Sequence, residues 1–239
     1  MTITAAGLRV KIYADGADRA GLLAIAANPL IQGFTTNPTL MRRAGITDYA
    51  GFARDILAEI RDRPISFEVF SDEFDEMQRQ AETIAGWGDN VYVKVPITNT
   101  RGESIIPLLT RMAPSGVKFN VTALFTERQV QAASDALADA APCNISVFAG
   151  RVADAGMDPL PLMRRALEIM APRPQQALIW ASPREILNVV QAHDIGCHII
   201  TVTHDILAKL PGLGKNLDQF SLETVRMFRN DAVAAGYSL

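Results

Sequence analysis

Cysteine, lysine and long apolar runs are scarce in this chain of 239 residues. Its two cysteines, Cys143 and Cys197, stand in apolar surroundings without CxxC spacing, which favours reduced, buried thiols of a cytoplasmic protein over a disulfide framework. No segment approaches the roughly 20 apolar residues that a membrane-spanning helix requires. The N-terminus shows no basic region followed by a long apolar stretch, so no secretory signal is expected. We therefore expect a soluble, cytoplasmic protein with no membrane partner.

A basic patch and the common metal and nucleotide motifs are also missing. The net charge is −3, and the basic residues are scattered singly or in pairs, which argues against a nucleic-acid partner. The three histidines, His193, His198 and His204, lack the spacing of a metal site such as HExxH, and we interpret them as surface or core residues. No GxGxxG or P-loop sequence is present. We expect neither a metal nor a nucleotide cofactor.

The chain does contain short runs rich in Val, Ile and Phe that alternate with longer stretches of helical period. This alternation is typical of β/α units around a parallel sheet. Strands are predicted at approximately 9–15, 31–35, 65–70, 91–96, 117–122, 143–148, 177–181 and 197–202. Helices are predicted at 47–62, 73–87, 101–113, 126–140, 159–171 and 183–193.

Eight such units in a chain of this length favour a single domain over residues 1–239, a closed (β/α)8 barrel of the TIM type. Closure removes the strand edges that an open sheet would have to protect, and the doubly wound open sheet is the alternative. An additional C-terminal helix is predicted at about 220–237, opening with Ser221 followed by Glu223. It should pack on the barrel or on a neighbouring subunit.

Catalytic groups of such barrels lie at the C-terminal ends of the strands, so polar residues within otherwise apolar strands are the candidates. Few positions meet this criterion: Asp15, Glu68, Lys94, Asn120, Thr122 and Ser146, with Asn37 following the second strand.

Lys94 is the most informative of these residues, because the chain has five lysines against eighteen arginines and this one lies between Val93 and Val95. Side chains alternate along a strand, so packing of the valines against helices would direct Lys94 into the barrel. Apolar burial favours the neutral amine, the form that attacks a carbonyl to give a Schiff base. A buried ion pair of Lys94 with Glu68 or Asp15 is the alternative, and the residues alone favour neither.

The two carboxylates also have two interpretations each. Asp15 can cap the helical stretch that follows it, the more common role for such a residue, or act as a base at the mouth of the barrel. Glu68, between Phe67 and Val69, needs either a structural partner or a role in proton transfer to be tolerated in a strand.

Arg151 and Ser182 follow the sixth and seventh predicted strands, where barrels often bind phosphate. A guanidinium, a hydroxyl and the start of a helix together suit a phosphate group. Arg184 lies two residues further on. Because arginines are common on loops, a surface role is the alternative.

The order of these motifs resembles that of the transaldolase family. An aspartate ends the first strand (YAD), and GFTTNPT, SFEV, VYVKVPIT, FNVTALF, ISVFAGR and WAS follow in the family's order between residues 9 and 205. The resemblance implies that Lys94 forms the Schiff base, that Asp15 takes the proton of the substrate hydroxyl, and that Glu68 and Thr122 hold the catalytic water. It implies substrate binding by Thr36, Asn37, Asn120, Ser146, Phe148, Arg151 and Ser182.

Two positions separate transaldolases from the related fructose 6-phosphate aldolases. Those aldolases carry Gln and Tyr where this chain has Glu68 and Phe148. Phenylalanine cannot donate a proton to the enamine, so the resemblance implies transfer of a dihydroxyacetone unit from a ketose phosphate to an aldose phosphate, without cofactor. The stretch WASPREIL is shorter than in the family and lacks the aromatic and basic residues usual after the serine, so the resemblance leaves open whether Arg184 binds phosphate and which sugar is used.

Three further expectations complete the prediction. By resemblance we expect a homo-oligomer that acts on small sugar phosphates. An aldolase that releases free dihydroxyacetone is one alternative. A catalytically silent sugar-phosphate-binding barrel is another, since fold does not determine function.

Overall fold

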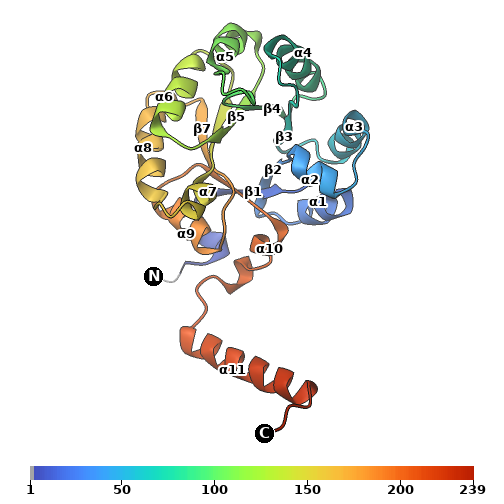
Figure 1. Ribbon diagram of the computed structural model, residues 1–239, viewed down its shortest axis with the longest axis vertical. Helices are drawn as coiled ribbons and strands as arrows, with labels where there is room; N and C mark the ends of the chain where they lie inside the picture. Colours follow the sequence, from blue (N-terminus) through green and yellow to red (C-terminus); the bar gives the residue numbers. More distant parts are fainter. Residues whose placement is uncertain (1–2) are drawn as a thin grey trace.

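The computed structural model describes residues 3–239, and in them eight parallel strands close into a barrel (Figure 1). The strands follow one another around the ring in chain order, and β1 closes it by pairing with β8. They are β1 (Lys11–Asp15), β2 (Ile31–Thr35), β3 (Ile65–Glu68), β4 (Val91–Pro96), β5 (Phe119–Leu124), β6 (Cys143–Val147), β7 (Gln176–Trp180) and β8 (Ile199–Val202). The predicted closed barrel is confirmed, and the open sheet is wrong. That the whole chain is a single domain stays a prediction.

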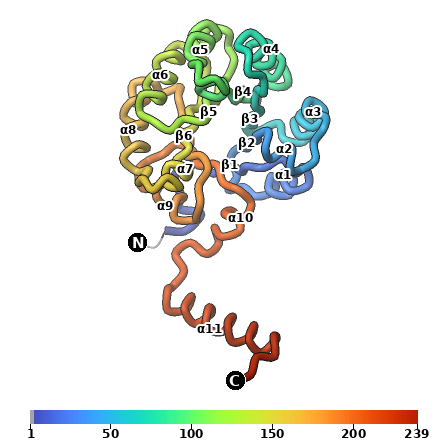
Figure 2. The backbone as a smooth tube through the Cα atoms, viewed as in Figure 1, coloured from blue at the N-terminus to red at the C-terminus, as the bar shows by residue number. Residues whose placement is uncertain are grey.

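The described residues contain eleven α-helices, and all but the last of them cover the outside of the barrel, as the tube in Figure 2 shows. They are α1 (Arg19–Ala26), α2 (Pro38–Arg43), α3 (Tyr49–Glu59), α4 (Phe74–Ala85), α5 (Ile106–Met112), α6 (Glu127–Ala136), α7 (Ala149–Asp154), α8 (Leu160–Met170), α9 (Leu187–Asp194), α10 (His204–Leu207) and α11 (Leu217–Ala234). Three 3-10 helices are η1 (Ala5–Gly7), η2 (Ala113–Ser115) and η3 (Leu210–Gly212). The short helices α2, α7 and α10 were not predicted, because segments of 6, 6 and 4 residues show too few turns for a helical period. The helical stretch expected after Asp15, without stated bounds, corresponds to α1.

The largest error among the strands concerns β5, predicted at 117–122 and observed at Phe119–Leu124. Ala123 has φ +61°, a left-handed conformation unusual for a residue with a side chain, and the pairing with β6 shifts register between Val121 and Leu124. An irregularity of this kind re-aims side chains and is common beside functional sites. Sequence periodicity does not reveal it.

Apolar side chains form two separate cores on the two faces of the barrel wall. Val91, Val93 and Val95 of β4 belong to the large core between strands and helices, as the alternation of a strand requires. A small cluster inside the barrel contains Tyr13 and Ile179. The inner face of β4 therefore carries Lys94, as the sequence predicted.

Both cysteines are free and buried, which confirms their predicted environment. Burial raises the pKa of the Cys143 and Cys197 thiols to about 12, so neither is a thiolate at neutral pH.

Helix α11 stands away from the barrel, at the end of the chain (Figure 1). It has 18 residues, none of them buried, and begins at Leu217 behind the cap Asn216, whose side chain accepts a hydrogen bond from the Gln219 amide. The predicted opening at Ser221 is wrong because Asn216 supplies the cap one turn earlier. Packing on its own barrel is also wrong. No helix within residues 3–239, α11 included, is both long and apolar enough to cross a bilayer.

Gly150 in α7 packs directly against the backbone of Ser182, in the loop after β7. A Cβ atom added there would lie 1.6 Å from the Ser182 carbonyl oxygen. We predict that Gly150→Ala lowers the free energy of unfolding by about 1–3 kcal/mol, because backbone on both sides has to move. Urea unfolding measures the change. Gly212→Ala is the matched control, because a Cβ there meets nothing within 4 Å. Equal effects of the two substitutions would contradict the predicted close packing.

Candidate active site

A cavity of about 560 Å³ opens at the C-terminal ends of the strands. Most of the side chains predicted to form the site line it: Asp15, Asn37, Glu68, Lys94, Thr122, Ser146, Phe148, Arg151 and Ser182. Thr36 and Asn120 do not line it. The barrel therefore brings together predicted residues from five of its eight strands, β1, β3, β4, β5 and β6, and from the loops after β2, β6 and β7, at the end where such barrels carry their chemistry.

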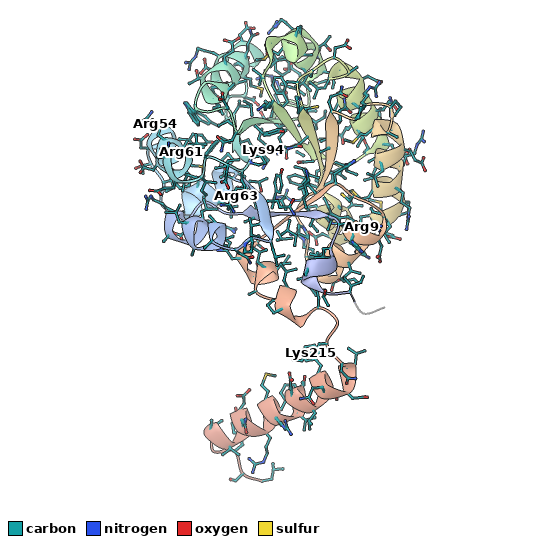
Figure 3. The ribbon with its side chains drawn as sticks, turned by 180° about the vertical axis from the view of Figure 1, so that it is seen from behind. Arg9, Arg54, Arg61, Arg63, Lys94 and Lys215 are labelled. Carbon is teal, nitrogen blue, oxygen red and sulfur yellow. The ribbon has the colours of Figure 1, made fainter. Side chains whose placement is uncertain are left out.

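Lys94 lies inside the ring of strands, where Figure 3 labels it. Its side chain is 8% exposed, and its Nζ atom is 3.2 Å from Glu68 Oε2 and donates to the Thr36 carbonyl oxygen at 3.1 Å. Glu68 is the register partner of Lys94 on β3. The ion pair with Glu68, one of the two interpretations of Lys94, is therefore present. It leaves the second interpretation open, since an amine paired with a carboxylate at a cavity can also react.

Glu68 is fixed through its backbone. The Tyr49 hydroxyl, on α3, donates to the Glu68 carbonyl oxygen at 2.9 Å and accepts from the Glu68 amide at 2.8 Å. The tyrosine ring packs against Phe67 and Trp87. The end of β3 is thereby held firmly while the carboxylate stays free to face the amine of Lys94.

Thr122 lies beside this pair and has unused hydrogen-bonding capacity. It pairs in register with Pro96 at the end of β4, and its Oγ1 atom is buried without a hydrogen-bond partner in residues 3–239. Buried hydroxyl groups normally bind protein or water. A water or a substrate oxygen would complete the hydrogen bonding of Thr122.

Asp15 is held by a short chain of hydroxyl groups. Thr35 Oγ1 donates to Asp15 Oδ1 at 2.7 Å and lies 2.5 Å from Thr201 Oγ1 on β8. Burial raises the pKa of Asp15, while the Lys94 charge, the Thr35 hydroxyl and His204 act in the opposite direction. A carboxyl group with a raised pKa accepts a proton more readily than an ordinary aspartate.

The alternative interpretation of Asp15 as a helix cap is wrong. Helix α1 begins at Arg19, and its cap is Asp18, whose side chain accepts a hydrogen bond from the Gly21 amide. Asp15 lies in β1 and faces the cavity instead.

Asn120 and Thr36 support the cavity from beneath. Asn120 donates to Ser66 Oγ at 3.0 Å and accepts from Ser146 Oγ at 2.7 Å, so both ends of its amide are engaged. The Thr36 hydroxyl donates to the Ser66 carbonyl oxygen. Both side chains are fully buried. Direct substrate contact by these two side chains, which the resemblance implied, stays a prediction, whereas Ser146 lines the cavity.

Asn37 lies at the cavity and also caps a helix. Its Oδ1 atom accepts from the Leu40 amide at 3.0 Å and so begins α2, where Pro38 occupies the first turn. With Oδ1 engaged, the amide nitrogen of Asn37 is the group left to donate to a ligand.

Two arginines and a serine, Arg151, Arg184 and Ser182, line the part of the cavity that follows β6 and β7. The Arg151 guanidinium lies 5.2 Å from the centre of the Phe148 ring and forms no salt bridge within residues 3–239. Arg184, by contrast, binds both carboxylate oxygens of Asp154, with its Nε atom 3.0 Å from each, and the pKa of Asp154 is lowered by that contact. The charge of Arg184 is therefore already compensated.

Ser182 adds a hydroxyl group to this rim in a strained backbone conformation. Its φ of +58° is left-handed, and Gly150 leaves room for its carbonyl oxygen. Non-glycine residues in this region cluster at binding sites.

Thr35 and Thr201 were missed by the sequence reasoning, although both are buried polar residues of apolar strands. The criterion that selected Lys94 applies equally to Thr201 in CHIITV and would have found it. Thr35 stands at the end of β2, as Asp15 stands at the end of β1, and the two pair in register. No group of three or more His, Cys, Asp or Glu side chains within residues 3–239 is placed to hold a metal ion.

The chain matches the family model described as transaldolase/fructose-6-phosphate aldolase over residues 12–239. It is 36% identical to a "Probable transaldolase" of Dehalococcoides mccartyi over 182 residues, 76% of this chain and 81% of the relative. A "Probable transaldolase" of Streptococcus pyogenes is 37% identical over 202 residues, 84% of this chain and 90% of the relative.

Solved structures with the same fold include a putative phosphonomutase from Burkholderia cenocepacia, with a TM-score of 0.56 and 14% identity, covering 93% of this chain and 94% of that one. An enolase described as a putative galactarate dehydratase, from Agrobacterium radiobacter, has a TM-score of 0.55 and 13% identity, covering 82% of this chain and 52% of that one. At such low identities these two likenesses concern the barrel alone. With the family model and the relatives in agreement, the chain belongs to the transaldolase/fructose-6-phosphate aldolase family.

Proposed function

We propose that this protein is a transaldolase that cleaves a ketose phosphate between C3 and C4 through a Schiff base on Lys94 and passes the dihydroxyacetone unit to an aldose phosphate. The observation that carries the proposal is the Lys94 amine, buried at the cavity 3.2 Å from Glu68. Activity of the transaldolase type follows from the family; the donor, the acceptor and the roles of single residues are the proposal.

Imine formation requires the amine to lose a proton before it attacks the C2 carbonyl group. Glu68 lies close enough to take that proton, and its carboxylate together with the unpartnered Thr122 hydroxyl suits the water that leaves when the carbinolamine collapses. No metal or organic cofactor is needed, because the protonated imine serves as the electron sink.

Asp15 performs the next step. It takes the proton of the C4 hydroxyl group, the C4–O bond becomes the carbonyl of the departing aldehyde, and the electrons of the C3–C4 bond pass into the iminium to give an enamine on Lys94. The raised pKa of Asp15 suits a group that must hold this proton until the acceptor arrives. Condensation with the acceptor reverses the same movements, so no proton is gained or lost in the complete cycle.

Substrate binding divides between the two sides of the cavity. Asn37 and Ser146 are assigned to the dihydroxyacetone unit, with Asn120 supporting Ser146 and the Thr36 carbonyl oxygen supporting Lys94. Arg151 and Ser182 are assigned to the distal phosphate. Arg184 is left out of this set because Asp154 compensates its charge.

The aldolase alternative depends on whether a proton reaches the enamine before an acceptor does. Phe148, beside the cavity, has no proton to give, which favours transfer over release of free dihydroxyacetone. The silent-barrel alternative is disfavoured because Asp15, Glu68, Lys94 and Thr122 all reach one cavity. A cytoplasmic location remains part of the proposal.

We also propose that the protein is a homo-oligomer in which α11 packs on a second copy of the chain. Leu217, Phe220, Met227 and Phe228 are exposed and fall on one stripe of the helix. Most of the stability of helices in proteins comes from tertiary packing of an apolar face, and α11 buries no residue within its own chain. Phe70 is 63% exposed and lies between two shallow apolar grooves, which Tyr49 and Trp87 also line. This surface of the barrel is suited to bind helix α11 of a second copy.

The first prediction concerns covalent trapping. Incubation with fructose 6-phosphate followed by borohydride reduction should add one reduced dihydroxyacetone or hexose unit to the peptide that contains Lys94, and Lys94→Met should abolish it. Lys118→Met is the matched control, because this lysine lies outside the cavity and donates to the Asp89 carbonyl oxygen. Peptide mass analysis gives the answer, and an adduct at any other lysine would refute the assignment.

The second prediction separates transfer from simple cleavage. With fructose 6-phosphate alone the protein should release little free dihydroxyacetone, and adding an aldose phosphate acceptor should start turnover. Phe148→Tyr should increase release by at least about tenfold, since a positioned general acid contributes roughly 10²–10⁴-fold. Phe125→Tyr is the control, because it adds the same hydroxyl group to the ring beside Phe148. Steady release by the unaltered protein without acceptor would favour the aldolase alternative.

The third prediction concerns assembly. Phe228→Glu should weaken association by about 2 kcal/mol or more, as for a central interface aromatic, and lower the mass measured by light scattering. Arg226→Ala, on the opposite side of α11, should leave the mass unchanged. A monomer in the unaltered protein, or the same mass in both variants, would be inconsistent with packing through this stripe.

A further inference from the structure

Helix α2 presents one of its faces to the catalytic cavity. Thr39, Leu40 and Arg43 all line the cavity, and residues three or four apart share a helix face. Met41, between them, is buried in the large core and holds the helix against the barrel. Arg43, the last residue of α2, therefore borders the cavity, and the proposed mechanism gives it no role.

The order of the strands places Arg43 and Arg151 on opposite sides of the barrel mouth. The strands follow one another around the ring, so β2 and β6 each stand two positions from β4, which carries Lys94, and four positions from each other. Arg43 lies on the helix after β2, and Arg151 lies on the helix after β6. Both line the same cavity. A sugar bound to the Lys94 amine would therefore have an arginine on either side.

Two of the three arginines that line the cavity have no carboxylate partner. Arg184 forms a salt bridge with Asp154, whereas Arg43 and Arg151 form none within residues 3–239. Arg43 is also exposed, so its guanidinium group is accessible to a ligand that enters the cavity. The charges of Arg43 and Arg151 are therefore the two available to an anionic substrate.

The charge of a sugar phosphate is larger than one arginine can balance. A phosphate monoester carries a charge of about −1.5 to −2 at neutral pH and presents three acceptor oxygens, while a guanidinium group carries a single positive charge. Within the proposed function, we propose that Arg43 is a second arginine of the phosphate subsite, which binds the substrate phosphate from the side opposite Arg151. The two guanidinium groups together balance the dianion, so the site selects phosphorylated over uncharged sugars.

A purely structural role is the alternative for Arg43. Arg42 and Arg43 both stand in the last turn of α2, where a positive charge interacts favourably with the helix dipole. The two residues would share this effect. They do not share the contact with the cavity, because Arg42 lines a groove beside Phe70 instead. Substitution of Arg42 is therefore the matched control.

The first test measures binding without chemistry, in the full-length protein. Glucitol 6-phosphate carries the phosphate of fructose 6-phosphate but has no carbonyl group, so it cannot react with Lys94. Arg43→Gln should raise the Kd of glucitol 6-phosphate, measured by titration calorimetry, by about tenfold or more, since a hydrogen bond between charged groups is lost. Arg43→Lys should recover part of the affinity because it restores the charge. Arg42→Gln should leave the Kd unchanged.

The second test separates the phosphate from the rest of the substrate. In Arg43→Gln the KM for fructose 6-phosphate, assayed with an aldose phosphate acceptor, should rise by a factor similar to that of the Kd, with kcat changed less than KM. Borohydride trapping of dihydroxyacetone at Lys94 should proceed as in the unaltered protein, because dihydroxyacetone has no phosphate to lose contact with Arg43.

The outcomes distinguish this inference from the proposed function. The role of Arg43 would be overturned by an unchanged Kd in Arg43→Gln, by equal losses in Arg42→Gln and Arg43→Gln, or by no binding of glucitol 6-phosphate to the unaltered protein. A parallel loss of dihydroxyacetone trapping in Arg43→Gln would also overturn it, because the residue would then shape the whole site. Absence of any Lys94 adduct in the unaltered protein would instead refute the proposed chemistry, and calorimetry would still report whether Arg43 binds the phosphate.

Discussion

A lysine on the inner face of a closed barrel has little water to solvate its charge, so the protein must supply the solvation itself. Here the Glu68 carboxylate and the Thr36 carbonyl oxygen do so, from β3 and from the end of β2. Removing either partner of a buried pair leaves a charge uncompensated, which costs far more than the pair contributes. The Lys94 side chain therefore requires β3 and the end of β2 to keep their positions, so that both of its partners stay within hydrogen-bonding distance.

Several of the remaining polar groups around this pair are joined by hydrogen bonds. Asn120 lies in register with Lys94 and joins Ser66 to Ser146, while the two threonines Thr35 and Thr201 lead to Asp15. Each of these contacts crosses between strands. Satisfied networks in a low-dielectric interior are rigid, so the barrel presents its two carboxylates and its amine with little freedom to rearrange.

Sequence reasoning found the residues whose type conflicts with their surroundings. Lys94 and Glu68 interrupt apolar strands, and such a conflict is visible without coordinates. It failed where the deciding contact is made by a residue distant in the chain or by the backbone. The contact of the Thr36 hydroxyl with the Ser66 carbonyl oxygen, on the neighbouring strand, is of this kind. The cap role of Asp15 was wrong because Asp18 starts the helix, and Ala123 and Ser182 reveal their left-handed backbones only in three dimensions.

The proposed transfer of a carbon unit places an unusual demand on such a site, because the enamine would have to survive until a second substrate enters. A proton donor beside the enamine would shorten that lifetime, and the cavity is lined by Phe148, whose ring lies tilted against that of Phe125 and beneath the Arg151 guanidinium. The Arg151 guanidinium lies over this ring without a salt bridge in residues 3–239, so under the proposed function its charge is available to an anionic substrate. Arg184, by contrast, forms a salt bridge with Asp154, which compensates its charge. If the proposed function holds, the same aromatic ring therefore has two roles: it gives no proton to the intermediate, and it orients the guanidinium toward the substrate phosphate.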